Sequence, residues 1–153
     1  GLVSLSQSTY GSTSVAALAV AAHEIGHVMQ HQEGYIPIKI RNAILPAASI
    51  GSTAAPYIVI LGAIMGSYNL AMIGVYLFLA MLIFQIVTLP VELNASGRGL
   101  EMLESGGYIS YDQRGDAKAV LRAAAMTYIV AALSTLVSFL RLLMIANNSR
   151  RRN

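Results

Sequence analysis

The sequence predicts a mainly α-helical integral membrane protein. It should have about three transmembrane helices and a further helix, with a His-Glu-x-x-His pattern, at the membrane face. The 153-residue chain is 56% hydrophobic and only 11% charged, with a mean hydropathy of +0.61, whereas soluble domains carry about 25% charged residues. Two long stretches contain no charged residue, and the His-Glu-x-x-His pattern precedes the first of them. We expect one domain over residues 1–153, truncated at its N-terminus because the chain begins without Met or a signal-peptide pattern.

The N-terminal part is expected to contain a short strand and a helix. Residues 2–6, LVSLS, alternate apolar and polar side chains, which is typical of a half-buried strand. A helix is predicted over residues 14–32, where alanine is abundant. A serine or threonine among residues 12–14 can cap its N-terminus, and Gly34 can end it.

The first uncharged stretch predicts a membrane hairpin. No charged residue occurs between Arg41 and Glu92, which is more than the roughly 20 residues that one span needs. The turn-forming residues 66–69, GSYN, divide the stretch in two. Pro90 is expected to stop or kink the second span. The two predicted spans are residues 44–65 and 70–89.

A third span is predicted over residues 123–145. The uncharged residues between Arg122 and Arg141, extended by LLMIA, are enough for a tilted helix. The alternative is a long buried helix of a soluble domain. Between the second and third spans, residues 91–122 look like two polar helices separated by the break SGGYIS.

The predicted hairpin has a consequence for any functional site. Two spans return the chain to the membrane face that it left. Residues 1–41 and 91–122 should therefore lie on the same face, and a site that joins them would be built there.

The spacing of His23 and His27 points to a metal site. Residues four apart lie on one face of a helix, and two imidazoles at this spacing can occupy two corners of a zinc tetrahedron. Glu24 beside them can reach a water molecule on the metal. The alternative is that both histidines are polar core residues, although burial without metal or partners is costly. The chain has no Cys, which excludes a Cys-ligated zinc site.

A catalytic zinc ion usually has three protein ligands. His31 continues the spacing, but positions i, i+4 and i+8 climb about 12 Å along a helix, too far for one ion. We therefore expect His31 at the surface. Glu92 is the preferred third ligand, because a carboxylate at the end of a span is costly without a role and the hairpin returns it to the His23 face. The other acidic residues look like solvated or turn charges: Glu33, Glu101, Glu104, Asp112 and Asp116.

Two stretches, SVAALAVAAHEIGHVMQHQEGY and LPVELNASGRGLEML, resemble the YugP-type family of neutral zinc metallopeptidases of bacterial membranes. The resemblance covers nearly the whole chain, including the apolar hairpin and the run DAKAVLRAAAMTYIVAALSTL. Members of that family typically have in addition an N-terminal membrane segment and a soluble stretch. More distantly, the chain is similar to the HtpX-type and prenyl-protein-processing membrane proteases, which share the zincin-like His-Glu-x-x-His helix.

The distant resemblance implies further roles. Those proteases place a ligand Glu in a Glu-x-x-Ala-Asp pattern after a membrane hairpin, and Glu92 and Ala95 match its first and fourth positions. Ser96 stands where the pattern has Asp, which is expected to support a ligand His. Ser96 can form a hydrogen bond but not as an anion, and Asn94 is the other candidate for this supporting role.

The function predicted from the sequence is a zinc-dependent membrane endopeptidase that hydrolyses peptide bonds of membrane or unfolded proteins. Zn²⁺ would be bound by His23, His27 and Glu92, with Glu24 as the general base on a zinc-bound water. Candidates for a further oxyanion donor are Arg98, Tyr108 and Tyr111. The alternatives are a zinc hydrolase of a non-peptide amide or ester, and a catalytically inactive membrane scaffold or chaperone-like protein.

The expected partners are the lipid bilayer and protein or peptide substrates, not nucleic acid. Part of the net charge of +3 comes from the tail SRRRN beyond the third span, where basic residues meet lipid headgroups. Six basic residues are expected on the catalytic face, against three or four on the other side. This excess favours a cytoplasmic catalytic face in a bacterial cell membrane; the six are Lys39, Arg41, Arg98, Arg114, Lys118 and Arg122.

Overall fold

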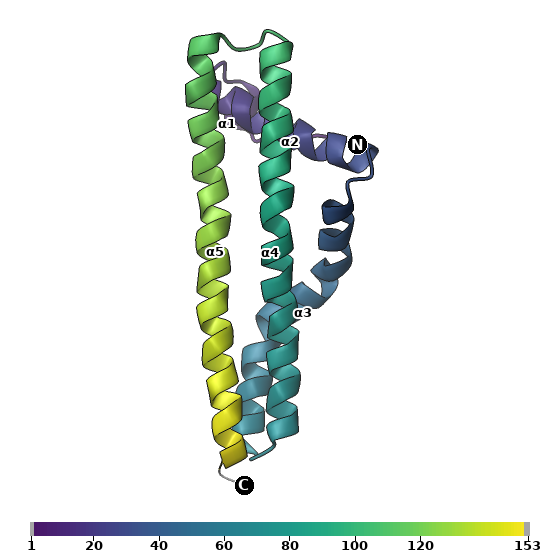
Figure 1. Cartoon of the computed structure of the whole chain (residues 1–153), viewed down its shortest axis with the longest axis vertical. Helices are drawn as coiled ribbons and strands as arrows, with labels where there is room; N and C mark the ends of the chain where they lie inside the picture. Colours follow the sequence, from purple (N-terminus) through teal and green to yellow (C-terminus); the bar gives the residue numbers. More distant parts are fainter. Residues whose placement is uncertain (1, 152–153) are drawn as a thin grey trace. The chain divides into compact units, whose positions relative to one another are not determined.

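The computed structural model describes residues 2–151, and their regular secondary structure is helical throughout (Figure 1). The mainly α-helical class predicted from the sequence is confirmed. The end of the basic tail, Arg152 and Asn153, lies outside the described residues. The helices in chain order are α1 (Gln7–Tyr10), α2 (Val15–Gln32), α3 (Ile36–Ile64), α4 (Tyr68–Ser105) and α5 (Tyr111–Arg151).

The short strand expected over residues 2–6 is not formed. These residues have no regular secondary structure, and Ser6 instead caps α1 by accepting a hydrogen bond from the backbone N–H of Thr9. A strand is stable only when its backbone groups pair with neighbouring strands, and residues 2–151 contain none. The alternating pattern was therefore misleading.

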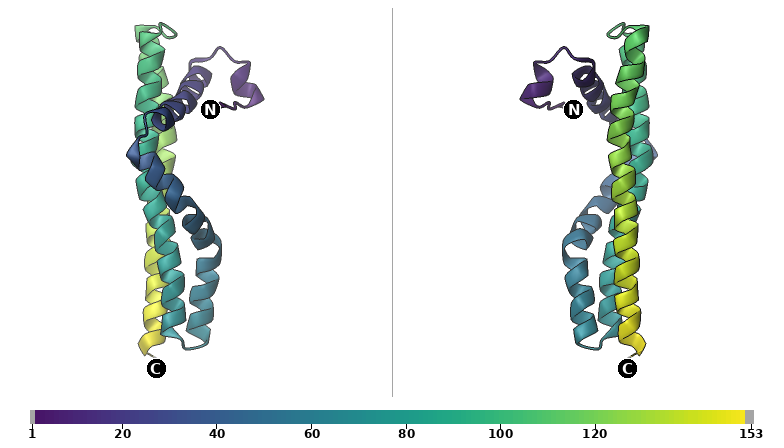
Figure 2. Two further views of the ribbon diagram at one scale, coloured as in Figure 1. Left: turned by 90° about the vertical axis from the view of Figure 1, so that its right-hand side faces the viewer. Right: turned by 90° about the vertical axis from the view of Figure 1, so that its left-hand side faces the viewer.

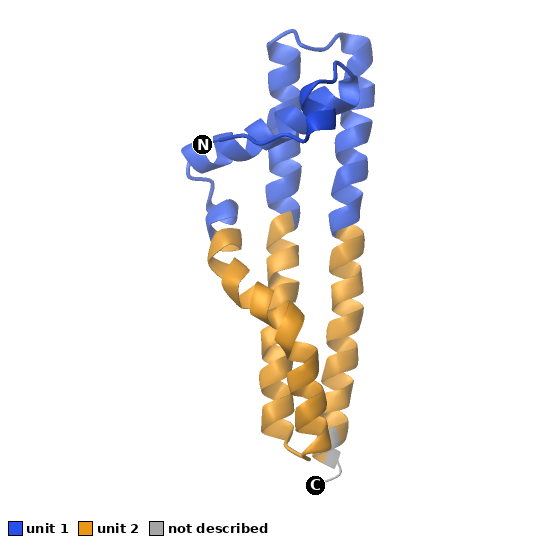
Figure 3. Cartoon of the chain, turned by 180° about the vertical axis from the view of Figure 1, so that it is seen from behind, with its two compact units in different colours: residues 1–39, 89–128 blue, residues 40–88, 129–153 orange. Residues whose placement is uncertain are grey.

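The helices form two compact units (Figure 3). Unit 1 contains residues 1–39 and 89–128, and unit 2 contains residues 40–88 and 129–153. The chain passes into unit 2 within α3 and returns to unit 1 within α4. The His-Glu-x-x-His residues and Glu92 therefore belong to the same unit.

In unit 1, α2 crosses α4 (Figure 2). The parts of α4 and α5 that belong to this unit run alongside each other. Ser14 caps α2 by accepting a hydrogen bond from the backbone N–H of Ala17 at 3.2 Å, and Gly34 follows the helix with φ +69°. The core of this unit joins the three helices and the loop before α5. Its buried members are Ala19, Ala22, Leu103, Ile109, Ala117 and Leu121.

In unit 2, parts of α3, α4 and α5 pack through small residues. A Cβ at Gly62 would lie 2.4 Å from the backbone nitrogen of Ala71, and one at Gly74 would lie 2.8 Å from the carbonyl oxygen of Ala55. Such contacts let helix backbones approach closely, as they do in membranes. The buried cluster of this unit contains Ala55, Val59, Ala71, Val75, Phe78, Leu142 and Ala146.

Three helices are long and apolar enough to cross a membrane: Ile36–Ile64, Tyr68–Ser105 and residues Tyr111–Asn148 of α5. Only 22%, 22% and 17% of their most apolar windows are buried within the protein. Apolar surface on this scale is not left in water by soluble monomers. The alternative of a buried helix in a soluble domain is therefore disfavoured.

The polar segment 91–122 is built from the ends of two long helices rather than from two separate ones. Pro90 lies inside α4, which continues to Ser105, and α5 starts at Tyr111 after the expected break. Proline removes one backbone hydrogen bond but does not end this helix. As a result, Glu92 lies on the same helix as the second predicted span.

Candidate metal centre

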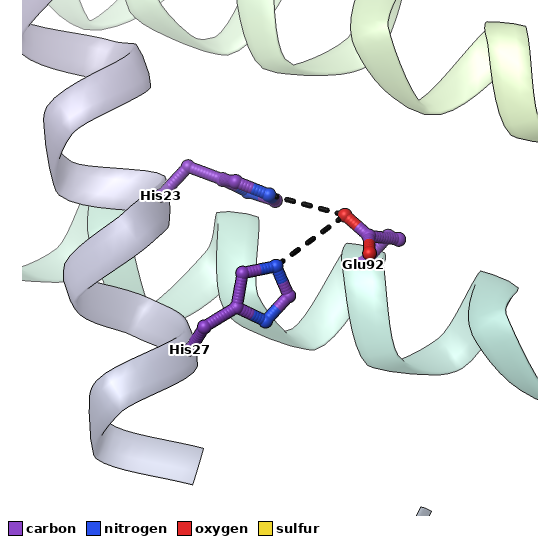
Figure 4. A group of neighbouring side chains, drawn as sticks. All are labelled: His23, His27 and Glu92. Carbon is purple, nitrogen blue, oxygen red and sulfur yellow. Dashed lines mark ion pairs between the residues drawn. The ribbon is translucent and has the colours of Figure 1, made fainter. Parts of the chain in front are cut away.

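Three candidate ligands from two helices of unit 1 point toward one another (Figure 4). The imidazoles of His23 and His27 project from α2, and the carboxylate of Glu92 projects from α4. The Nε2 atom of His23 is 3.1 Å from Oε2 of Glu92, and the Nε2 atom of His27 is 3.5 Å from the same oxygen. One potential ligand atom of each residue lies within 4.8 Å of the other two.

The two nitrogen–oxygen distances are those expected around a tetrahedral zinc ion. With zinc–ligand bonds of about 2.0–2.1 Å, neighbouring ligand atoms in a tetrahedron lie roughly 3.3 Å apart. The two measured nitrogen–oxygen separations bracket this value. Two imidazoles and one carboxylate are also a typical ligand set of catalytic zinc, in which the fourth position is open to water or substrate.

Two glycines allow the ligand-bearing helices to approach this closely. A Cβ at Gly26 would lie 2.2 Å from the carbonyl oxygen of Ala95, and one at Gly99 would lie 2.6 Å from that of Ala22. No side chain fits at such distances, so α2 and α4 are in direct backbone contact on both sides of His23. The close contact brings Glu92 within reach of both imidazoles.

The buried carboxylate of Glu92 favours a cation in the site. Glu92 is only 3% exposed, and a buried carboxylate is costly unless it is paired. The hydrogen bond between Glu92 and His27 raises the pKa of the His27 imidazole, against the lowering effect of burial. A proton or a metal ion between the His27 imidazole and the Glu92 carboxylate would balance the charge of the buried carboxylate.

The Nδ1 atoms of the two histidines have different partners. Nδ1 of His23 is 3.0 Å from the hydroxyl of Ser96, and Nδ1 of His27 is 2.9 Å from Oε1 of Gln30. Hydrogen bonds of this kind orient metal-binding imidazoles and increase their basicity. Asn94 does not contact a histidine, but its Oδ1 accepts hydrogen bonds from Gln30 at 3.0 Å and from Arg98 at 2.7 Å.

The structure places several other candidates away from the three ligands. His31 is exposed and does not belong to the ligand group. The Arg98 guanidinium pairs with Glu33 at 2.5 Å and lies over the ring of Tyr35. The remaining two oxyanion candidates, Tyr108 and Tyr111, are both exposed and do not line the cavity beside the ligands.

Two cavities border the candidate ligands, and Glu24 lines both of them. The first has a volume of about 190 Å³ and a largely apolar wall from α5. It is lined by Val20, His23, Glu24, Glu92, Ser96, Val120, Leu121, Ala124, Ala125 and Tyr128. The second, of about 290 Å³, is lined by Leu2, Val3, Ser4, Glu24, His27, Val28, His31 and Gln32.

Gln30 and the wall that α5 contributes to the cavity were not predicted from the sequence. Gln30 could have been found from its position, because it follows His27 by three residues and so lies near it on the helix surface. The wall residues, among them Tyr128, were assigned only to a membrane span. Nothing in their local sequence shows that they lie beside histidines more than 90 residues earlier in the chain.

These features define a class: a helical protein with three helices of membrane-spanning length and a His-His-Glu group spaced as zinc ligands are. The chain belongs to the family described as "Putative neutral zinc metallopeptidase", which matches residues 1–147. It is also 42% identical over 152 residues to "Putative membrane protease YugP" of Bacillus subtilis (strain 168). That alignment covers 99% of this chain and 68% of the relative. No solved structure matches the chain. The family resemblance is thereby confirmed.

Proposed function

We propose that this protein is a zinc-dependent endopeptidase of a bacterial cell membrane, acting on membrane or unfolded proteins from the cytoplasmic face. The observation that carries the proposal is the convergence of His23, His27 and Glu92 beside Glu24. Membership of a zinc metallopeptidase family and the apolar helices support it.

Zinc would be held by Nε2 of His23, Nε2 of His27 and the carboxylate of Glu92. When bound there, zinc supplies a Lewis acid that polarises a carbonyl group and acidifies water. The protein's own contribution is to hold these donors in place. Ser96 and Gln30 orient the imidazoles, and the close contact at Gly26 and Gly99 keeps α2 against α4.

Glu24 is suited to the role of general base. It is half-buried, follows His23 directly and lines both cavities. Its carboxylate can take a proton from the attacking water and pass it to the leaving amine. The apolar cavity beside it excludes water from one side of the reaction and accepts an apolar side chain of the substrate.

The experiment that tests this function compares the Glu24→Gln variant with the wild-type protein, both purified in detergent. Glu24→Gln should retain stoichiometric zinc but lose about 100-fold or more of its casein-cleaving activity, because proton transfer contributes factors of this size. Glu101→Gln makes the same chemical change at an exposed site on α4 and should leave both measurements unchanged. His23→Ala should lose zinc as well as activity.

Two results would overturn the proposal. Wild-type protein without stoichiometric zinc would favour the inactive scaffold. Wild-type zinc content and hydrolysis of esters or simple amides, with no cleavage of any peptide, would instead favour the alternative hydrolase.

A further inference from the structure

Gln30 is a fully buried polar side chain at the centre of unit 1, with 0% of its surface exposed. Its Oε1 atom is 2.9 Å from Nδ1 of His27. Its Nε2 atom donates to the carbonyl oxygen of Val91 at 2.8 Å and to Oδ1 of Asn94 at 3.0 Å. Burial of an amide is costly unless its groups are hydrogen-bonded, and here both ends have partners.

The hydrogen-bond partners of Gln30 determine which side of its amide group is the oxygen and which is the NH₂. A backbone carbonyl oxygen can only accept hydrogen bonds, so the group facing Val91 must be the NH₂. Arg98 can only donate, so Asn94 must present its oxygen to Arg98 and hence to Gln30. With the amide reversed, the Gln30 oxygen would face two other acceptors, the carbonyl oxygen of Val91 and Oδ1 of Asn94.

It follows that Oε1 of Gln30 faces His27 and that Nδ1 of His27 is the donor. A neutral imidazole carries one proton, so its Nε2 then presents a lone pair. That lone pair is directed at the ligand group, since Nε2 is the atom 3.5 Å from Glu92. His23 is not constrained in this way, because the Ser96 hydroxyl can either donate or accept.

Gln30 also joins the two helices that carry the ligands. Val91, whose carbonyl it binds, immediately precedes Glu92 on α4. One side chain therefore contacts a ligand of α2 and the turn of α4 that holds the third ligand. The exposed ion pair of Arg98 with Glu33 completes this chain of hydrogen bonds at the surface.

We propose that Gln30 is a positioning residue of the metal centre. It holds His27 in the tautomer with the proton on Nδ1, which leaves Nε2 for the metal, and it fixes the distance between His27 and Glu92. This inference rests on the proposed zinc site but concerns a residue that is not itself a ligand.

The test is Gln30→Met in the full chain, with Gln7→Met as the matched control. Methionine has a similar length but forms no comparable hydrogen bonds, and Gln7 is an exposed residue of α1 that lines neither cavity beside the candidate ligands. Competition with a chelator should show zinc affinity reduced by roughly 10- to 100-fold in Gln30→Met and unchanged in Gln7→Met. The visible spectrum of the cobalt-loaded protein should change only in Gln30→Met, because it reports the geometry of the ligands.

A measurement on the wild type keeps the inference testable if Gln30→Met does not fold. In zinc-loaded protein labelled with ¹⁵N-histidine, His27 should show an Nδ1-bound proton protected from exchange with water. Coordination through Nδ1, or rapid exchange of that proton, would overturn the inference.

Failure of this inference differs from failure of the proposed function. If the wild type binds zinc and Gln30→Met binds it equally well with the same cobalt spectrum, only the role of Gln30 is wrong. If the wild type binds no zinc, the metal centre itself is wrong and both proposals fall.

Discussion

At the scale of single residues, the two histidines of the candidate site are supported unequally. His27 is held by a buried amide whose orientation is determined, whereas His23 is held by a hydroxyl that can rotate. Neither the Ser96 hydroxyl nor the Gln30 amide adds negative charge to the imidazole that it orients.

The apolar cavity leads to a prediction about substrate preference. Ala124 lines the cavity from α5, while Ala123 beside it is exposed and does not. Ala124→Leu should reduce cleavage of peptides with bulky apolar side chains by about tenfold or more, because it narrows the cavity of about 190 Å³ next to Glu24. Cleavage rates measured on a peptide series would check this, and zinc content should not change.

Ala123→Leu provides the control, since it adds the same side chain one position away. An equal loss of activity in both variants would mean that the cavity does not bind the substrate.

The candidate ligands and Ser96, the partner of His23, were predictable at this scale, and Gln30, the partner of His27, was not predicted. The spacing of His23 and His27 and the position of Glu92 after a membrane hairpin are properties of the sequence itself. The position of Gln30 three residues after His27 places it near that histidine, but its hydrogen bond to a carbonyl 61 residues later in the chain has no local pattern. The strand expected over residues 2–6 failed for a related reason, since local alternation says nothing about whether a partner strand exists.

At the scale of elements, the contact between α2 and α4 depends on Gly26 and Gly99. Gly99→Ala places a Cβ 2.6 Å from a backbone carbonyl oxygen, so the helices must separate. Overpacking of this kind costs about 1–3 kcal/mol. We expect Gly99→Ala to unfold at lower denaturant concentration and to bind zinc more weakly, as followed by circular dichroism and chelator competition.

Gly97→Ala is the matched control for this change. It lies on the same helix, two residues away, and a Cβ there meets no atom within 4 Å. Alanine should stabilise the helix at that position by about 0.5–1 kcal/mol. A Gly99→Ala variant as stable as Gly97→Ala would show that the close contact is not needed.

The lengths of α4 and α5 were the least predictable feature among the elements. Pro90 was expected to stop or kink the helix of the second span, and α4 runs on through it to Ser105. A proline weakens a helix by one hydrogen bond, but packing against neighbouring helices can maintain it. Such packing is not visible in a local pattern.

At the scale of the whole molecule, the three apolar helices predict how the chain crosses the membrane. Residues before α3 and those between α4 and α5 should lie on one side, and the connection between α3 and α4 on the other. The chain has no Cys, so single cysteines can report these positions. Ser8→Cys and Ser105→Cys should react with an impermeant thiol reagent only after the cells are opened, and Asn69→Cys in intact cells.

This experiment separates two claims. Labelling of Asn69→Cys from the same side as Ser8→Cys would contradict the hairpin. If Ser8→Cys and Ser105→Cys react in intact cells and Asn69→Cys reacts only after the cells are opened, the hairpin is kept but the site lies outside the cytoplasm.

The division of the ligands between α2 and α4 also determines when the site can first exist. Residues 28–91 separate His27 from Glu92. The helix α3 lies entirely within this interval, and α4 begins in it. At a synthesis rate of about 5–20 residues per second, a ribosome needs roughly 3–13 s to make this part of the chain. During that time the nascent protein displays two histidines but no third ligand. The proposed hydrolase would therefore be completed only after α3 and the first part of α4 have been synthesised.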